Sequence, residues 1–121
     1  MTVDKCALVI TSSVHVTAPF TVLTDAIERE KEYLDSIRFF LEHSPIKNII
    51  VCDNSGHSYP DVLYDLAKSQ NKELELLSFN GSGDLVAKYG KGYGEGEIME
   101  FILSNSMLMQ QLEGFLKVTG S

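Results

Sequence analysis

The sequence predicts an α/β domain in which helices cover both faces of a mostly parallel sheet of about four strands. Continuous apolar runs rich in β-branched residues, such as residues 6–10 and 46–52, are typical of strands buried on both faces. Segments with helical periodicity separate these runs, which favours right-handed crossovers and three layers. Because 121 residues suffice for one core, residues 1–121 are expected to form a single domain.

The first half of the chain predicts the order strand, helix, strand. Residues 6–10 (Cys-Ala-Leu-Val-Ile) form the first strand, and residues 46–52 form the second. Between them, apolar side chains recur at helical spacing: Leu23, Ile27, Leu34, Ile37 and Leu41. Charges at residues 28–35 alternate in sign, which indicates a solvated helix face with short-range ion pairs.

The second half predicts helix, strand, helix, strand. The expected elements are a short helix at about residues 61–70, an edge strand at 73–79, a helix from about residue 95, a helical piece at 107–112 and a fourth strand at 114–121. The side chains expected to face inward from the two longer helices are Val62, Leu63, Leu66 and Ala67, and then Ile98, Phe101 and Ile102.

Composition argues against two classes of partner. The formal net charge is −7, with 17 acidic and 10 basic side chains, whereas binding to nucleic acid needs clustered Lys and Arg. No apolar stretch reaches the ~18–20 residues of a transmembrane segment, and none resembles a signal peptide. We therefore expect a cytoplasmic protein.

Cys6 and Cys52 lie in predicted strands and are expected to be buried, reduced thiols.

Polar residues follow each predicted strand, at the edge where parallel sheets bind ligands. Hydroxyls and backbone amides after the first strand are suited to a phosphate or a ribose, and a carboxylate after the second is suited to a ribose diol or a base edge. Ordinary turn chemistry explains the same residues, so both interpretations stay open. The candidates are Thr11, Ser12, Ser13 and His15, then Asp53, Asn54, Ser55 and His57, then Asn80, Gly81 and Ser82.

Residues 80–96 contain six of the nine glycines and are expected to form a loop. This loop lacks the spacing of a Walker loop, and it does not follow the first strand as a dinucleotide fingerprint does. Its two lysines, free backbone N–H groups and adjoining helix N-terminus are suited to an anionic group such as a diphosphate. A mobile connector is the alternative. The candidate binding residues here are Lys88, Gly90, Lys91, Gly92, Gly94 and Glu95, of which Glu95 could instead pair with Lys91 or cap the helix.

Two groups of residues resemble a known family. A buried strand, a Thr/Ser segment, a long helix and a strand that ends Val51-Cys-Asp-Asn-Ser55 resemble the N-terminal, Rossmann-like nucleotide-binding half of GT-A glycosyltransferases. More specifically, Tyr89-Gly-Lys-Gly-Tyr-Gly-Glu-Gly-Glu-Ile98 and Lys117-Val-Thr-Gly120 resemble bacterial polysaccharide-type glycosyltransferase-like proteins, which read Gly-Lys-Gly-Tyr-Gly-Glu and Lys-x-Thr-Gly-Arg. The resemblance covers nearly the whole chain from Ala7, although Ser121 stands where the family has Arg.

The resemblance implies binding of a UDP- or GDP-type nucleotide sugar for glycan biosynthesis. It implies that Thr11 and Ser12 lie near the nucleotide and Asp53 near the base or ribose. The residues that it implies near the diphosphate or sugar are Lys88, Gly90, Lys91, Gly92 and Gly94. A longer relative would use Mg²⁺ or Mn²⁺, but no Asp-x-Asp motif and no cofactor site is evident here. No catalytic base can be assigned, so we expect binding rather than turnover by this chain alone.

Two other interpretations fit the same topology. A non-catalytic interaction or assembly module would use the scaffold without chemistry and would dimerise through an exposed sheet edge. Its contact face would draw on Phe20, Tyr59, Tyr93 and Met107 to Met109. A flavodoxin-like or receiver-like domain has a similar order of elements but needs a clustered acidic pocket that the sequence does not indicate.

Overall fold

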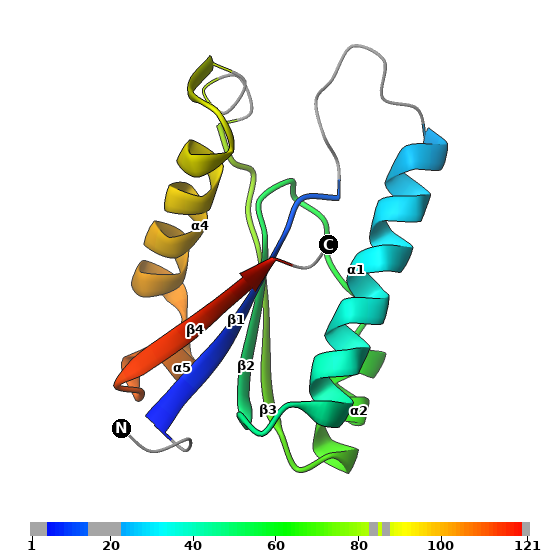
Figure 1. Cartoon of the computed structure of the whole chain (residues 1–121), viewed down its shortest axis with the longest axis vertical. Coiled ribbons are helices and arrows are strands. Elements are labelled where there is room, and N and C mark those ends of the chain that lie inside the picture. Colours follow the sequence, from blue (N-terminus) through cyan, green and yellow to red (C-terminus); the bar gives the residue numbers. More distant parts are fainter. Residues whose placement is uncertain (1–4, 15–22, 83–84, 86–87, 120–121) are drawn as a thin grey trace.

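The structure is a computed structural model that describes residues 5–14, 23–82, 85 and 88–119 (Figure 1). Strands and helices alternate along most of the chain. In order, they are β1 (Cys6–Ser12), α1 (Leu23–His43), β2 (Asn48–Asp53), α2 (Val62–Ser69), β3 (Glu73–Ser78), α4 (Lys91–Asn105), α5 (Met107–Gln110) and β4 (Gly114–Thr119). His15 and Phe20, which the sequence singles out, lie outside the described residues.

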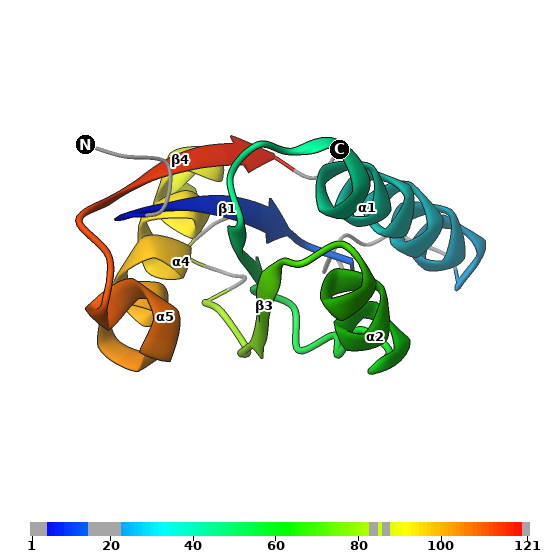
Figure 2. The same ribbon diagram turned by 90° about the horizontal axis from the view of Figure 1, so that it is seen from below.

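The four strands form one parallel sheet in the order β3-β2-β1-β4. The central strand β1 is hydrogen-bonded to β2, with Leu8 opposite Ile49, and to β4, with Leu8 opposite Leu116. Helices α1 and α2 cover one face of the sheet, whereas α4 and α5 cover the other (Figure 2). The predicted class, a three-layer α/β fold with a parallel sheet, is confirmed.

Two hydrophobic clusters hold the layers together, one on each face of the sheet. Strand residues alternate between them, because successive side chains of a strand point to opposite faces. Leu8 and Ile10 pack under α1 and α2 with Ile37 and Leu63, among others. The other cluster consists of Ala7, Val9, Ile50, Cys52, Ile98 and Ile102. The continuous apolar runs therefore reflect strands that are covered on both sides, as the sequence predicts.

Helix α4 begins earlier than the sequence predicts. It starts at Lys91, so Gly92, Gly94 and Gly96 are helical, and the expectation of a loop up to residue 96 is wrong. Glycine disfavours a helix by about 1 kcal/mol relative to alanine. The packing of Ile98 and the rest of the helix against the sheet offsets this cost, which local propensity alone does not reveal.

Two side chains predicted to face the core are exposed instead. Ile27 on α1 and Val62 on α2 have 61% and 56% of their surface accessible. The buried stripe of α1 runs through Tyr33, Ile37 and Leu41. Val62 is the first residue of α2, and Leu63 takes the inward position one residue later. Tyr59, predicted as part of a contact face, is buried and cannot serve there.

The two edges of the sheet differ. At β3, the hydroxyl of Tyr64 accepts a hydrogen bond from the backbone N–H of Leu76 at 3.1 Å, so this edge is partly covered. At β4, Phe115 and Leu116 remain 46% and 57% exposed.

Among the described helices, none has an apolar stretch of the length needed to cross a membrane.

Candidate functional site

The path of the chain places the candidate site at the carboxyl ends of β1 and β4. The chain passes outward from β1 to β2 and β3, then crosses the other face to add β4 on the far side of β1. Open parallel sheets bind ligands at such a reversal of strand order. The first turns of α1 and α4 extend past the strand ends on opposite faces of the sheet (Figure 1).

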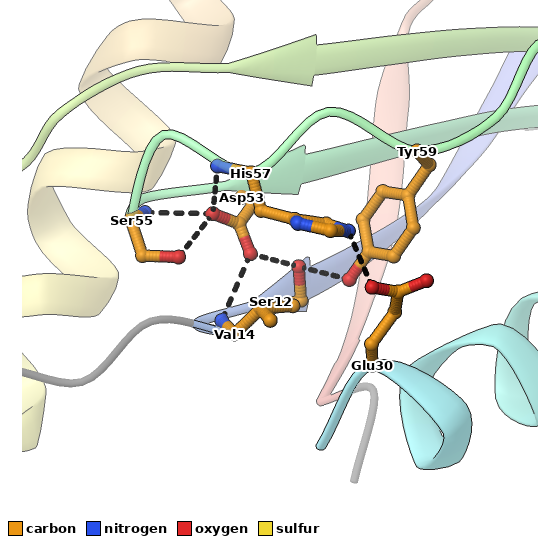
Figure 3. Close-up of polar contacts among 7 residues, drawn as sticks. All are labelled: Ser12, Val14, Glu30, Asp53, Ser55, His57 and Tyr59. Atoms are coloured by element: carbon orange, nitrogen blue, oxygen red, sulfur yellow. Dashed lines mark hydrogen bonds and ion pairs between the residues drawn. The ribbon is translucent and has the colours of Figure 1, made fainter. Parts of the chain in front are cut away.

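Asp53, the last residue of β2, ties together the segments that follow β1 and β2. Its side chain is fully buried, and both carboxylate oxygens accept hydrogen bonds (Figure 3). Oδ2 accepts from the hydroxyl of Ser12 at 2.7 Å and from the N–H of Val14 at 3.1 Å. Oδ1 accepts from the N–H and hydroxyl of Ser55 at 2.7 and 2.6 Å and from the N–H of His57 at 3.2 Å. Asp53 therefore holds the backbone at the end of β1 and the backbone after β2 in place, and these two segments form part of the site.

Tyr59 and His57 extend this network toward α1. The hydroxyl of Tyr59 donates to Ser12 Oγ at 2.7 Å. Burial, more than any nearby charge, raises the pKa of Tyr59 far above its usual value, so the hydroxyl stays protonated and keeps donating. The ring of His57 packs edge-on against Tyr59, and its Nε2 lies 3.5 Å from Glu30 Oε2 (Figure 3).

Arg29 and Glu30 contact residues outside α1, although the alternating charges predict that this helix face is solvated. Arg29 Nη1 donates to the backbone carbonyl of Ser13 at 3.4 Å, and Glu30 contacts His57. Both side chains are partly buried, whereas Glu28 and Lys31 are exposed. The expectation of a uniformly solvated charge run is therefore wrong for these two residues. Their partners lie in segments that follow β1 and β2, and periodicity within the helix cannot reveal such contacts.

On the other face of the sheet, Glu95 of α4 joins β1 to β4. The hydroxyl of Thr11 donates to Glu95 Oε1 at 3.3 Å, and Lys117 Nζ donates to Glu95 Oε2 at 2.8 Å. Thr11 is buried, whereas the side chains of Glu95 and Lys117 are 20% and 33% exposed. Glu95 therefore does not cap the helix; it holds two strands at the reversal point. Lys117 belongs to the Lys-Val-Thr-Gly segment, although the sequence pattern alone does not identify it as a site residue.

The glycine-rich segment has fewer unbonded backbone N–H groups than a loop would have, because it is helical from Lys91. Lys88 is exposed, and its Nζ lies 5.2 Å from the centre of the Tyr89 ring. Gly90 immediately precedes α4, and its carbonyl accepts from the N–H of Tyr93 at 3.1 Å. The side chain of Lys91 lies outside the described part of the chain. Amides from the second turn onward are bound within the helix, so anion binding through this backbone is limited to the first turn.

Asn54 lies between the segments that follow β1 and β3. Its N–H donates to the carbonyl of Ser12 at 3.1 Å, and its carbonyl accepts from the N–H of Gly81 at 2.8 Å. Its side-chain Oδ1 is buried, and no described residue donates to it. The N–H of Ser82 is bound by Glu97 Oε1 at 3.1 Å. Asn54 thus has an unused acceptor that a hydroxyl or amide donor of a ligand would satisfy.

Neither a thiol nucleophile nor a metal cluster emerges from the described residues. Cys52 is fully buried, and burial, with a smaller effect from the charge of Asp53, raises its pKa to about 12. The thiol is therefore protonated and unreactive at neutral pH. Cys6 is only partly buried, in contrast to the sequence expectation. Among the described side chains, no three from His, Cys, Asp or Glu are placed to share a metal ion.

The sequence-predicted residues separate into two groups around the end of β1. Ser12, Ser13, Asp53 and Ser55 lie toward α1 and α2, whereas Thr11 and Glu95 lie toward α4. Such an edge offers hydroxyls, one unused amide oxygen and cations held by weak or exchangeable contacts, a set suited to a polar anionic ligand. No protein-family model, curated protein or solved structure matches this chain.

Proposed function

We propose that the protein binds a nucleotide sugar of the UDP or GDP type at the carboxyl end of its sheet, as a glycosyltransferase-like protein of glycan biosynthesis. One observation carries the proposal. The two segments that resemble such proteins, around Glu95 and Lys117, meet through a 2.8 Å ion pair at the reversal of strand order. They are 22 residues apart and sit on different elements, so this meeting supports a shared role.

The proposed roles follow from the donors and acceptors at this edge. Lys117 would leave Glu95 to contact a phosphate oxygen, since a partly exposed ion pair is weak enough to exchange. Asn54 Oδ1 would accept from a ribose hydroxyl or a base N–H. Asp53 would act indirectly, because its oxygens already bind Ser12, Val14 and the residues after β2.

Chemistry beyond binding is proposed only in outline. Glycosyl transfer with inversion requires a base that deprotonates an acceptor hydroxyl, and we assign none among the described residues. The resemblance implies Mg²⁺ or Mn²⁺ in a longer relative, but the described side chains do not form a site that fits such an ion, so no step is assigned to a metal. A nucleotide-sugar ligand would agree with the cytoplasmic location expected from the sequence.

The proposal is tested by titrating ¹⁵N-labelled protein with UDP, GDP and their sugars and following the amide signals. We expect shifts at Thr11, Asn54, Gly81, Glu95 and Lys117 and little change at the opposite end of the sheet, for instance at Lys47. Unchanged signals at millimolar ligand would contradict nucleotide-sugar binding. Shifts spread evenly over the molecule would also contradict it, because they would indicate a non-specific effect.

A second candidate function is supported by the open edge at β4. Phe115 and Leu116 are exposed there, whereas Tyr64 partly covers the opposite edge. Unpaired edges with apolar side chains favour pairing with another chain. An assembly module would therefore form a constitutive dimer that Leu116→Lys disrupts. Sedimentation velocity separates the two functions, because a monomer that binds nucleotide supports the first and a dimer without nucleotide affinity supports the second.

A further inference from the structure

Arg29 is a cation that the fold turns toward the end of β1. It lies in the second turn of α1, where its neighbours Glu28 and Lys31 are exposed, yet its own side chain is partly buried. Its Nη1 donates to the carbonyl of Ser13, directly after β1. At 3.4 Å this bond is long for an N–H···O contact, so the guanidinium is positioned without being strongly bound.

Among the described residues, Arg29 uses little of its hydrogen-bonding capacity. A guanidinium has five N–H donors, and the Ser13 carbonyl takes one. Arg29 takes part in none of the ion pairs among the described residues. Two acidic residues of this region have other partners: Glu30 contacts His57, and Asp53 accepts five hydrogen bonds. A cation that has no ion-pair partner among the described residues is notable in a chain with a net charge of −7.

We propose that Arg29 binds a phosphate group of the ligand at the carboxyl end of β1, from the α1 side of the sheet. Lys117 pairs with Glu95 of α4, and α1 and α4 lie on opposite faces of the sheet (Figure 2), so the two cations would approach a diphosphate from opposite faces of β1. The planar guanidinium fork matches two phosphate oxygens at once, which a lysine cannot do. This inference rests on the proposed function, because it takes the ligand to be a nucleoside diphosphate.

The competing explanation gives Arg29 a purely structural role, in which it supports the Ser13 carbonyl or offsets the buried charge of Asp53. The two explanations differ in what a charge-removing variant changes. A structural role lowers the melting temperature and leaves the affinity of the folded protein unchanged. A ligand contact lowers the affinity, and the loss persists under conditions in which the variant is fully folded.

Arg38 offers a matched control. It is the only other arginine in the chain, it lies on the same helix, and it is exposed. The experiment measures binding of UDP and of inorganic pyrophosphate by isothermal titration calorimetry to the wild type, Arg29→Gln and Arg38→Gln. We expect Arg29→Gln to weaken both ligands at least tenfold and Arg38→Gln to weaken them less than twofold. Arg29→Lys keeps the charge without the fork and should give an intermediate loss, and it serves if Arg29→Gln fails to fold.

The outcomes separate this inference from the proposed function. If the wild type binds UDP and Arg29→Gln or Arg29→Lys binds it equally well, the role of Arg29 is refuted while the nucleotide site stands. Equal losses in the Arg29 and Arg38 variants would also refute it, because they would reflect net charge alone. If the wild type binds neither ligand at millimolar concentration, the proposed function fails and this inference fails with it.

Discussion

Lys117 Nζ lies 2.8 Å from Glu95 Oε2, so the last described strand is fixed to the second turn of α4. The same carboxylate accepts from the hydroxyl of Thr11 on β1. One side chain thus spans the reversal point of the sheet. A partly exposed ion pair contributes little to stability, typically below about 1 kcal/mol. Its position at the edge where a ligand would enter is therefore more informative than its strength.

Replacing Glu95 with Gln should strengthen nucleotide binding and hardly change stability. Gln keeps the oxygen that accepts from Thr11 but releases Lys117 for a phosphate. We expect UDP affinity to rise severalfold, while the free energy of unfolding falls by less than about 1 kcal/mol. Calorimetric titration and urea unfolding measure the two quantities. Glu100→Gln, an exposed position on the same helix, removes the same charge and should leave affinity nearly unchanged; an equal rise in both variants would speak against a specific role.

Replacing Asp53 with Asn should destabilise the fold strongly. Asn keeps one accepting oxygen, but the NH2 group that replaces the other oxygen cannot accept, so the buried donors from Ser12 and Val14, or those from the Ser55 segment, lose their acceptor. An unsatisfied buried donor costs about 1–3 kcal/mol, and we expect a loss of about 2–3 kcal/mol in urea unfolding. Asp65→Asn on the exposed side of α2 should change stability by less than about 0.5 kcal/mol. Equal stability of the two variants would disprove the organising role of Asp53.

Stability should decline in the alkaline range. Burial raises the pKa of Cys52 to about 12, whereas a thiol in the unfolded chain ionises near pH 8.5. The raised pKa stabilises the folded state fully below about pH 8.5, and this contribution is lost as pH rises toward 12. Burial also raises the pKa of Tyr59, which adds to the decline above about pH 10.

The test compares the pH dependence of urea unfolding in the wild type and in Cys52→Ala. The variant should lose stability less steeply between pH 9 and 11, by up to about 1.4 kcal/mol per pH unit. Its absolute stability will also change because a packed side chain is removed, so the slope is the quantity to compare. Parallel slopes in the two proteins would show that Cys52 does not ionise on unfolding.

Glycine-to-alanine substitutions should have opposite signs at two positions. Gly96 is helical, and a Cβ there meets nothing within 4 Å, so Gly96→Ala should stabilise the protein by about 0.5–1 kcal/mol. Gly56 has φ +80°, and a Cβ there would collide with Asn80 Oδ1, so Gly56→Ala should destabilise. Thermal unfolding of both variants checks the signs. Destabilisation by Gly96→Ala would mean that residue 96 is not helical.

The strands were the most predictable part of the fold, because burial on both faces requires continuous apolar runs. The first strand was nevertheless expected to end at Ile10, whereas β1 continues to Ser12. Thr11 and Ser12 are polar and resemble the start of a loop. They stay in the strand because Glu95 and Asp53, distant in sequence, accept their hydrogen bonds. The pattern of neighbouring residues does not reveal that a polar side chain has a hydrogen-bond partner far away in the sequence.

The sequence predicts where the candidate site lies but only some of the residues that form it. Parallel topology brings strand ends together, so Thr11, Ser12 and Asp53 were expected at one edge. Arg29 was missed because a charge in an alternating run looks solvated, and only the position of the segment after β1 turns it inward. The start of α4 was missed because glycine content is a local signal, whereas packing against the sheet decides whether the helix forms.

The position of β1 between β2 and β4 also has a consequence for synthesis. Cys6 pairs with Gly114, so the central strand and one of its two neighbours are translated about a hundred residues apart. Until β4 has left the ribosome, β1 is itself an edge strand with one row of backbone groups unpaired. The nascent chain therefore carries its most apolar strand half-paired for most of its translation. Chaperones and aggregation would compete for it during that interval.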